Sequence, residues 1–173
     1  LNPGRYNFIE GLPFRVLLDY GHNPDGVAEV CAIAAGLPVA GRRRLLSQNL
    51  GNRHRQHLDH MAPQLARSFD RIVLGCNPAI VARCPDYAGD DPVRAMLSHG
   101  LDCLLRAGMP ADALRVEADP VTAIRAALDA AEAGDLLVML ADPAIALSAI
   151  EPWRHHLLAA APGPHSHPLN DTP

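Results

Sequence analysis

The residues with the clearest chemical arrangement lie in the segment Asp19-Tyr20-Gly21-His22-Asn23-Pro24-Asp25. The apolar run before Asp19 is typical of a strand covered on both faces, and Asn23-Pro24 is typical of a helix start. A carboxylate at the end of a strand can accept two sugar hydroxyls, and the free N–H groups of a helix N-terminus favour an anion. The segment therefore predicts contacts with ribose and phosphate. A plain strand-to-helix turn, with Asn23 as the cap and a satisfied Asp19, is the alternative.

The basic residues limit the chemistry that this chain can perform alone. All 15 of them are Arg, so the chain has no Walker A lysine and no Schiff-base lysine. The glycine-rich phosphate loops G-x-x-x-x-G-K-[ST] and G-x-G-x-x-G are also missing. Arg42-Arg43-Arg44 with Arg53 and Arg55 forms a local basic cluster that could hold phosphate or an anionic polymer, or be a solvated surface run. Any phosphoryl chemistry therefore needs its main phosphate cradle from elsewhere.

Histidine and cysteine spacings predict no metal ligands in this chain. His54, His57 and His60 recur every three residues, which favours a solvated helix face over a shared metal. The four cysteines show no C-x-x-C spacing, so we expect reduced thiols buried in the core of a cytoplasmic protein; they are Cys31, Cys76, Cys84 and Cys103.

Composition excludes several other classes of protein. The net charge of −4 disfavours a nucleic-acid partner, because phosphate neutralisation needs a basic surface. No apolar run reaches the roughly 18 residues that a membrane span needs. The chain begins at Leu1 without a secretory signal, so we expect a fragment or a processed product.

Apolar periodicity and Gly/Pro punctuation predict strands that alternate with helices. We expect strands at residues 5–10, 14–19, 44–47, 71–74, 114–117 and 136–140. We expect helices at residues 24–36, 53–69, 92–107, 120–133 and 143–158, with a kink or break at Pro63 and a loop over 75–91. This order predicts a Rossmann-like α/β domain over residues 1–160. Its mostly parallel sheet carries helices on both faces and opens with a hairpin-like strand pair. We expect residues 161–173 to form a flexible Pro/His-rich tail.

A resemblance to a known family rests on the opening residues. Pro3-Gly4-Arg5, followed about a dozen residues later by the Asp19–Asp25 segment, resembles the start of the C-terminal domain of the Mur ligase family. The resemblance implies ATP-dependent amide ligation through an acyl phosphate, with the P-loop and the Mg²⁺ ligands in a central domain. The implied partners are ATP, an amino acid, and the central and N-terminal domains of the same polypeptide. The isolated chain is expected to be inactive.

The same resemblance assigns roles to individual residues. By position, Arg5 would contact the nucleotide from the interdomain hinge and Asp19 would bind ribose hydroxyls. His22 would approach the ribose or the phosphates, with Asn23 beside it.

Within the family, the motifs most resemble the C-terminal region of cyanophycin synthetase. Gly51-Asn52-Arg53-His54-Arg55 stands where that enzyme has a G-D-R-R-like segment, which implies that Asn52, Arg53 and Arg55 bind the incoming amino acid. Ala141-Asp142-Pro143 follows the last strand in place of a G-K-G-H-E motif. Only Asn77-Pro78 remains of a D-N-P-R motif, which disfavours diaminopimelate as substrate. A folylpolyglutamate- or peptidoglycan-type ligase domain, and a non-catalytic nucleotide-binding or interaction module, remain alternatives.

Overall fold

The centre of the fold is a six-stranded sheet in the order β1-β2-β6-β3-β4-β5. The structure is a computed structural model that describes residues 6–50 and 54–160. The strands are β1 (Asn7–Ile9), β2 (Arg15–Asp19), β3 (Arg43–Ser47), β4 (Arg71–Leu74), β5 (Leu114–Val116) and β6 (Leu136–Leu140). β1 is antiparallel to β2, and every other neighbouring pair is parallel. This confirms the predicted α/β sheet and its hairpin-like opening.

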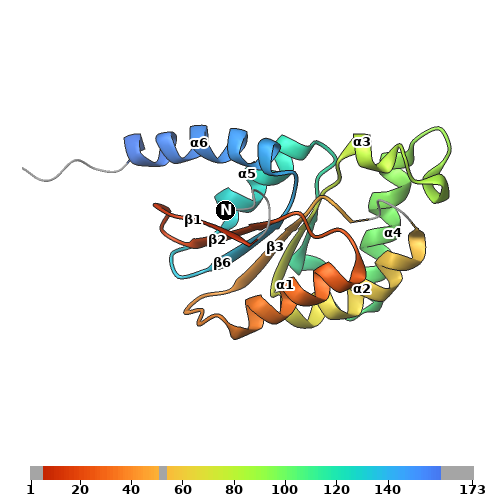
Figure 1. Cartoon of the computed structure of the whole chain (residues 1–173), viewed down its shortest axis with the longest axis horizontal. Coiled ribbons are helices and arrows are strands. Elements are labelled where there is room, and N and C mark those ends of the chain that lie inside the picture. Colours follow the sequence, from red (N-terminus) through yellow and green to blue (C-terminus); the bar gives the residue numbers. More distant parts are fainter. Residues whose placement is uncertain (1–5, 51–53, 161–173) are drawn as a thin grey trace, which may run out of the picture.

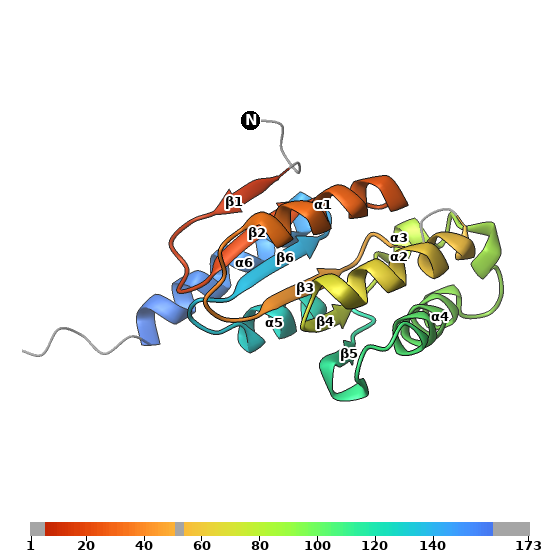
Figure 2. The same ribbon diagram turned by 90° about the horizontal axis from the view of Figure 1, so that it is seen from below.

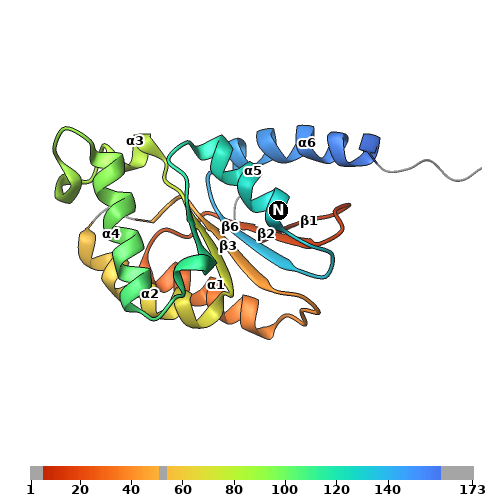
Figure 3. The same ribbon diagram turned by 180° about the vertical axis from the view of Figure 1, so that it is seen from behind.

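Helices cover both faces of the sheet, as predicted. The helices are α1 (Pro24–Gly36), α2 (Arg55–Ser68), α3 (Pro78–Val81), α4 (Pro92–Arg106), α5 (Pro120–Ala130) and α6 (Pro143–Ala160), with 3₁₀ turns η1 (Pro85–Tyr87) and η2 (Ala111–Ala113). α1, α2 and α4 lie on one face, and α5 and α6 lie on the other (Figures 1 and 2). The view from behind shows the same two layers, with α6 extending past the sheet (Figure 3).

Each face of the sheet has its own apolar core. Side chains of β2, β3, β4 and β6 alternate between the two faces, so Leu17 and Leu45 pack under α1, α2 and α4, whereas Leu18 and Leu46 pack under α5 and α6. β6 is buried along its whole length because strands flank it on both sides. The Trp153 ring on α6 lies 5.8 Å from the ring of Phe14, and its Nε1–H donates to Asp129 at 2.7 Å, so Trp153 holds this helix to the body.

A repeated Asx-Pro signal starts most of the helices. Asn23, Asn77, Asp91, Asp119 and Asp142 each precede a proline, and the side chain of each accepts a backbone N–H of its helix. An oxygen at the N-cap satisfies a donor that lacks a partner, and the proline suits the first helical position. α2 lacks this signal, since its N-cap is His54, and the His54 side chain makes no capping bond. Instead Asp86 of η1 accepts from the backbone N–H of Arg55 at 2.8 Å.

Two expectations about local structure, a break of α2 at Pro63 and a loop over 75–91, were wrong. Pro63 does not split α2, which is helical from Arg55 to Ser68, because the buried side chains Leu58, Met61, Ala62 and Leu65 hold it against the core. The expected loop over 75–91 contains α3 and η1. Both elements have a structural role: Asn77 caps α3, and η1 supplies the carboxylate that caps α2.

In the described part of the chain, no helix combines the length and the apolar character that crossing a membrane requires. The predicted tail at 161–173 lies outside the described residues, and α6 runs to Ala160.

Candidate functional site

The carboxyl ends of β2, β6, β3 and β4 lie along one edge of the sheet, where ligands bind in folds of this kind. The predicted segment Asp19–Asp25 lies at this edge, between β2 and α1. Asp19, His22 and Asn23 line one small pocket together with Tyr6 and neighbouring glycines. The structure thus brings together three of the predicted site residues, and the two side chains on which the prediction depends share a cavity.

The Asp19 carboxylate organises the backbone around this pocket. The side chain is 5 % exposed, with Oδ2 accepting the backbone N–H of Tyr6 at 3.0 Å and Oδ1 accepting that of Gly21 at 2.6 Å. Tyr6 adopts a positive φ of 50°, a conformation that this bond helps to hold. Each carboxylate oxygen keeps a second lone pair, so Asp19 retains the capacity to accept a hydroxyl.

His22 has one ring nitrogen engaged and one available. Its Nδ1 lies 3.1 Å from the carbonyl oxygen of Tyr20, and its ring packs edge-on against Tyr20 at 5.6 Å. A carbonyl only accepts, so Nδ1 carries the hydrogen and donates. In the neutral ring Nε2 is then an acceptor, which suits a hydroxyl better than a phosphate oxygen.

The N-terminus of α1 has few free donors for an anion. Pro24 has no N–H, and Asn23 uses its side-chain oxygen on Gly26 and its carbonyl on Val27. Among the first helical residues only the N–H of Asp25 has no acceptor in the described structure, and the Asp25 side chain adds a negative charge. This end of α1 therefore fits a sugar better than the phosphate that the sequence predicts.

Buried polar side chains follow the central strand β3. Ser47 and Asn49 are fully buried, and neither the Ser47 hydroxyl nor the Asn49 amide has a partner in the described structure. Gln48 between them donates to the carbonyl of Pro120 at 2.6 Å. An unpaired buried amide is costly, so Asn49 is a candidate for a ligand contact at the centre of the edge. Asn49 was not predicted from the sequence, although its place two residues after a central strand was a usable signal.

Of the three residues predicted to bind the amino acid, the structure describes Arg55. Arg55 starts α2 at the carboxyl edge, and its guanidinium carbon lies 5.8 Å from the ring centre of Tyr87. Arg5, Asn52 and Arg53 lie outside the described residues.

The predicted basic cluster does not form as one surface. Arg43 and Arg44 lie at the amino end of β3, whereas Arg55 follows its carboxyl end. Arg43 donates to the carbonyls of Ala34 and Leu37, and the buried Arg44 pairs with Asp135. Arg43 and Arg44 therefore stabilise the fold through these contacts.

Most of the chain matches one known protein family. Residues 4–142 match the family described as "Mur ligase, glutamate ligase domain", and the chain belongs to this family.

Two relatives carry the name UDP-N-acetylmuramoyl-L-alanyl-D-glutamate–2,6-diaminopimelate ligase. The Aquifex aeolicus protein is 28 % identical over 138 residues, which cover 80 % of this chain and 26 % of that protein. The Solibacter usitatus protein is 32 % identical over 139 residues, which cover 79 % of this chain and 25 % of that protein. The chain thus spans about a quarter of the length of these relatives.

Solved structures show the same fold. A diaminopimelate ligase of the same name superposes with a TM-score of 0.66 at 18 % identity, covering 88 % of this chain and 32 % of that chain. The Mycobacterium tuberculosis folylpolyglutamate synthase, solved with ADP and AMPPCP, superposes with a TM-score of 0.57 at 20 % identity. The match covers 89 % of this chain and 32 % of that chain.

Proposed function

We propose that this chain is the C-terminal domain of an ATP-dependent amide ligase, where it closes over the nucleotide and helps to bind the incoming amino acid. The observation that carries the proposal is the shared pocket of Asp19 and His22 at the carboxyl edge of the sheet. The family membership and the folylpolyglutamate synthase structure with ADP and AMPPCP support it.

The size of the pocket supports a site that a second domain completes. Its volume is about 40 Å³, whereas sites that enclose a small-molecule ligand measure roughly 300–1,000 Å³. Asp19 and His22 would therefore form one wall, against ribose hydroxyls that donate to Asp19 and to Nε2 of His22. The phosphates and Mg²⁺ would be held mainly by a central domain, because this chain contains no lysine and no glycine-rich phosphate loop.

The test is a ligation assay on the intact gene product that contains this chain, with release of phosphate from ATP as the readout. His22→Ala should raise the KM for ATP by roughly tenfold, in line with the loss of a hydrogen bond of about 1.5 kcal/mol. Asp19→Asn should have a larger effect, because one amide oxygen replaces two carboxylate oxygens. His60→Ala, an exposed substitution on α2, is the control. Unchanged kinetics in both variants would favour the non-catalytic module.

The same assay separates this chain from a self-sufficient enzyme. The chain alone should bind nucleotide weakly and should not hydrolyse ATP, because it would supply only one wall of the site. Robust ATP turnover by the chain alone would contradict the proposal.

For the amino acid, we propose arginine or aspartate added to an aspartate-containing acceptor, as in cyanophycin synthesis. Two features support this: the sequence of the segment Gly51–Arg55, and Asp142, which caps α6 where other family members carry G-K-G-H-E. Asn52, Arg53 and Arg55 would bind the amino acid, and Arg55 would do so from the start of α2. The four buried free thiols support a cytoplasmic reaction.

The named relatives favour diaminopimelate as a second candidate. The residue after Asn77-Pro78 weighs against it, since Ala79 cannot make the ionic contact that an arginine at this place would make. A substrate panel decides between them: arginine and aspartate with an aspartyl acceptor, diaminopimelate with a muramoyl dipeptide, and glutamate with folate. Turnover with only one pair identifies the substrate class.

A further inference from the structure

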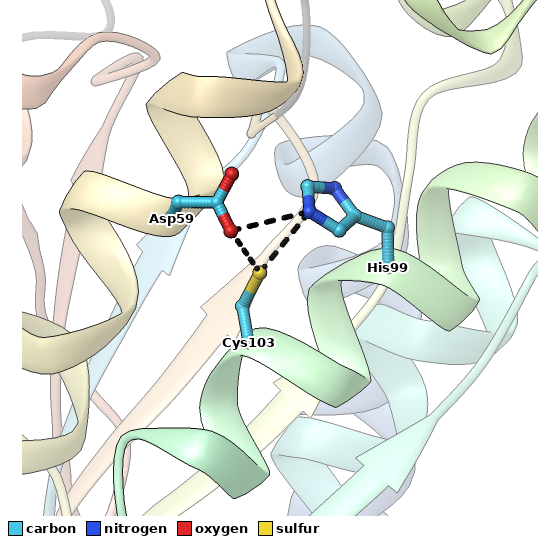
Figure 4. A group of neighbouring side chains, drawn as sticks. All are labelled: Asp59, His99 and Cys103. Carbon is cyan, nitrogen blue, oxygen red and sulfur yellow. Dashed lines mark hydrogen bonds and ion pairs between the residues drawn. The ribbon is translucent and has the colours of Figure 1, made fainter.

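Three side chains with metal-binding atoms meet between α2 and α4, away from the carboxyl-edge pocket. Sγ of Cys103 lies 3.2 Å from Oδ1 of Asp59 and 3.3 Å from Nε2 of His99, and the last two atoms lie 3.4 Å apart (Figure 4). His99 and Cys103 are four residues apart on α4, so they share one helix face, and Asp59 points at them from α2.

The triangle of ligand atoms has the dimensions of a metal site. With bonds of about 2.3 Å to sulfur and about 2.0 Å to nitrogen or oxygen, tetrahedral zinc separates its ligand atoms by roughly 3.3–3.6 Å. The three separations here are 3.2, 3.3 and 3.4 Å, so one ion can contact all three atoms after shifts of a few tenths of an ångström. This is the only group of three or more such side chains within the described ranges.

The surroundings prepare the ligands for a cation. The phenolic oxygen of Tyr87 lies 2.8 Å from Nδ1 of His99, which fixes the imidazole by the kind of outer contact that supports metal-bound histidines. A hydrogen bond from the Cys103 thiol lowers the pKa of Asp59, with smaller contributions from His99 and Arg106 after a small opposing effect of burial. Asp59 is therefore ionised at neutral pH.

A cavity of about 130 Å³ opens on two of the three side chains, Asp59 and Cys103, and Pro63, Arg106 and Ala107 complete its lining. It gives an ion a path from solvent and leaves room for a water as fourth ligand. His99 and Cys103 are buried, whereas the Asp59 side chain is 45 % exposed.

We propose that Asp59, His99 and Cys103 bind a zinc-class divalent cation, with the fourth position turned toward this cavity. Carboxylate, imidazole and thiolate together are donors that zinc accepts, and three protein ligands leave one position open. On binding, the Cys103 thiol loses its proton to solvent, and neutral His99 donates its Nε2 lone pair while Nδ1–H faces Tyr87. The two negative charges of the ligands balance the ion once the Arg106 guanidinium, which contacts Oδ1 of Asp59 and Sγ of Cys103, moves aside.

A free nucleophilic thiol is the main alternative, and the burial of Cys103 argues against it. Desolvation, together with the neighbouring Asp59, raises the pKa of Cys103 to about 11. A thiol in this state reacts slowly with electrophiles, because the thiolate is the nucleophile. A cation supplies the charge that stabilises the thiolate.

The experiment titrates the metal-free full chain with Co²⁺, and separately with Zn²⁺. We expect one ion per chain, visible bands of four-coordinate cobalt, and a near-ultraviolet thiolate-to-cobalt band that Zn²⁺ removes. Surface histidines would bind cobalt without the thiolate band. Cys103→Ser should abolish that band and weaken binding by at least roughly tenfold.

Matched variants keep the test decisive. Cys31→Ser changes a thiol that is also 3 % exposed, on α1, and should leave the titration unchanged. Asp59→Asn is half-exposed and isosteric, so it should fold even where Cys103→Ser does not, and it should also weaken binding. No stoichiometric binding, or binding that survives both Cys103→Ser and Asp59→Asn, would overturn the proposal.

Discussion

The hydroxyl of Tyr87 contacts Nδ1 of His99 at 2.8 Å, and this contact directs Nε2 of the imidazole toward Asp59 and Cys103. Tyr87 belongs to η1, and the guanidinium of Arg55, at the start of α2, lies over its ring. One tyrosine therefore connects the start of α2, where the amino acid is proposed to bind, with the proposed metal ligands.

Removing the Tyr87 hydroxyl should weaken metal binding while the three ligands stay in place. Tyr87→Phe keeps the ring and its packing, but it frees the imidazole to rotate, so we expect the Co²⁺ dissociation constant to rise by roughly tenfold. The thiolate-to-cobalt band should persist at saturation, unlike in Cys103→Ser. An unchanged dissociation constant would mean that core packing alone holds the His99 ring.

Removing the charge of Arg106 should strengthen metal binding. Its Nη2 lies 3.1 Å from Oδ1 of Asp59 and 3.2 Å from Sγ of Cys103, so the guanidinium occupies ligand atoms that a cation needs. Arg106→Gln removes this competing charge, and we expect the dissociation constant for Zn²⁺ to fall severalfold. Arg67→Gln, near the end of the same α2 that carries Asp59, is the control. Weaker binding in Arg106→Gln would show that the guanidinium supports the ligands instead.

The start of α2 should depend on a carboxylate from another element. Asp86→Ala removes the acceptor for the Arg55 N–H, and the loss of such a cap costs about 1 kcal/mol of unfolding free energy. Asp90→Ala changes an exposed carboxylate in the same connection and should be neutral. Urea unfolding measures both. Equal stabilities of the two variants would show that water caps α2 equally well.

The sequence predicts the order of elements well because strong local signals mark it. Asx-Pro pairs start five helices, and apolar runs such as residues 136–140 are long enough to require burial on both faces. The break predicted at Pro63 is absent because tertiary packing outweighs the loss of one helical hydrogen bond. The segment Asp19–Asn23 was placed correctly at the carboxyl edge, because strand-to-helix turns in parallel sheets always meet there.

The Asp59–His99–Cys103 group was not predicted, for a physical reason. The spacing of His99 and Cys103 is visible in the sequence, but Asp59 joins them only because α2 packs against α4. Likewise, residues 42–55 look like one basic cluster in the sequence, but the length of β3 separates the two ends of that segment.

Gly41 should be required because a carboxylate occupies the space of its missing side chain. A Cβ at this position would lie 2.2 Å from Oδ1 of Asp135, the oxygen that accepts the N–H of Arg42 at 2.7 Å. Gly41→Ala must displace that buried carboxylate, and we expect a loss of about 2 kcal/mol of unfolding free energy. Gly36→Ala is the control: it has open space at the end of α1 and should be neutral or slightly stabilising. Similar effects of the two substitutions would contradict this explanation.

The buried pair of Asp135 and Arg44 should make the stability of the fold depend on acid pH. Burial raises the pKa of Asp135, but the N–H groups of Arg42 and Glu132 and the Arg44 guanidinium lower it more, so its net direction is downward. The unfolded carboxyl has a pKa of about 3.9. The carboxylate therefore contributes its full stabilisation above that value and loses it as the pH falls through the lower folded value.

Asp135→Asn tests this dependence directly. It leaves the buried Arg44 without its partner charge, and we expect a loss of about 3 kcal/mol at pH 7. The difference from the native protein should begin to narrow below about pH 4, where the unfolded carboxyl becomes protonated, and should narrow further as the pH falls toward the lower pKa of the folded carboxyl. Asp112→Asn removes the exposed partner of Arg71 and should change stability by less than about 1 kcal/mol at any pH. Chemical denaturation between pH 3 and pH 7 measures both, and a difference that stays constant over this range would contradict the assigned role of Asp135.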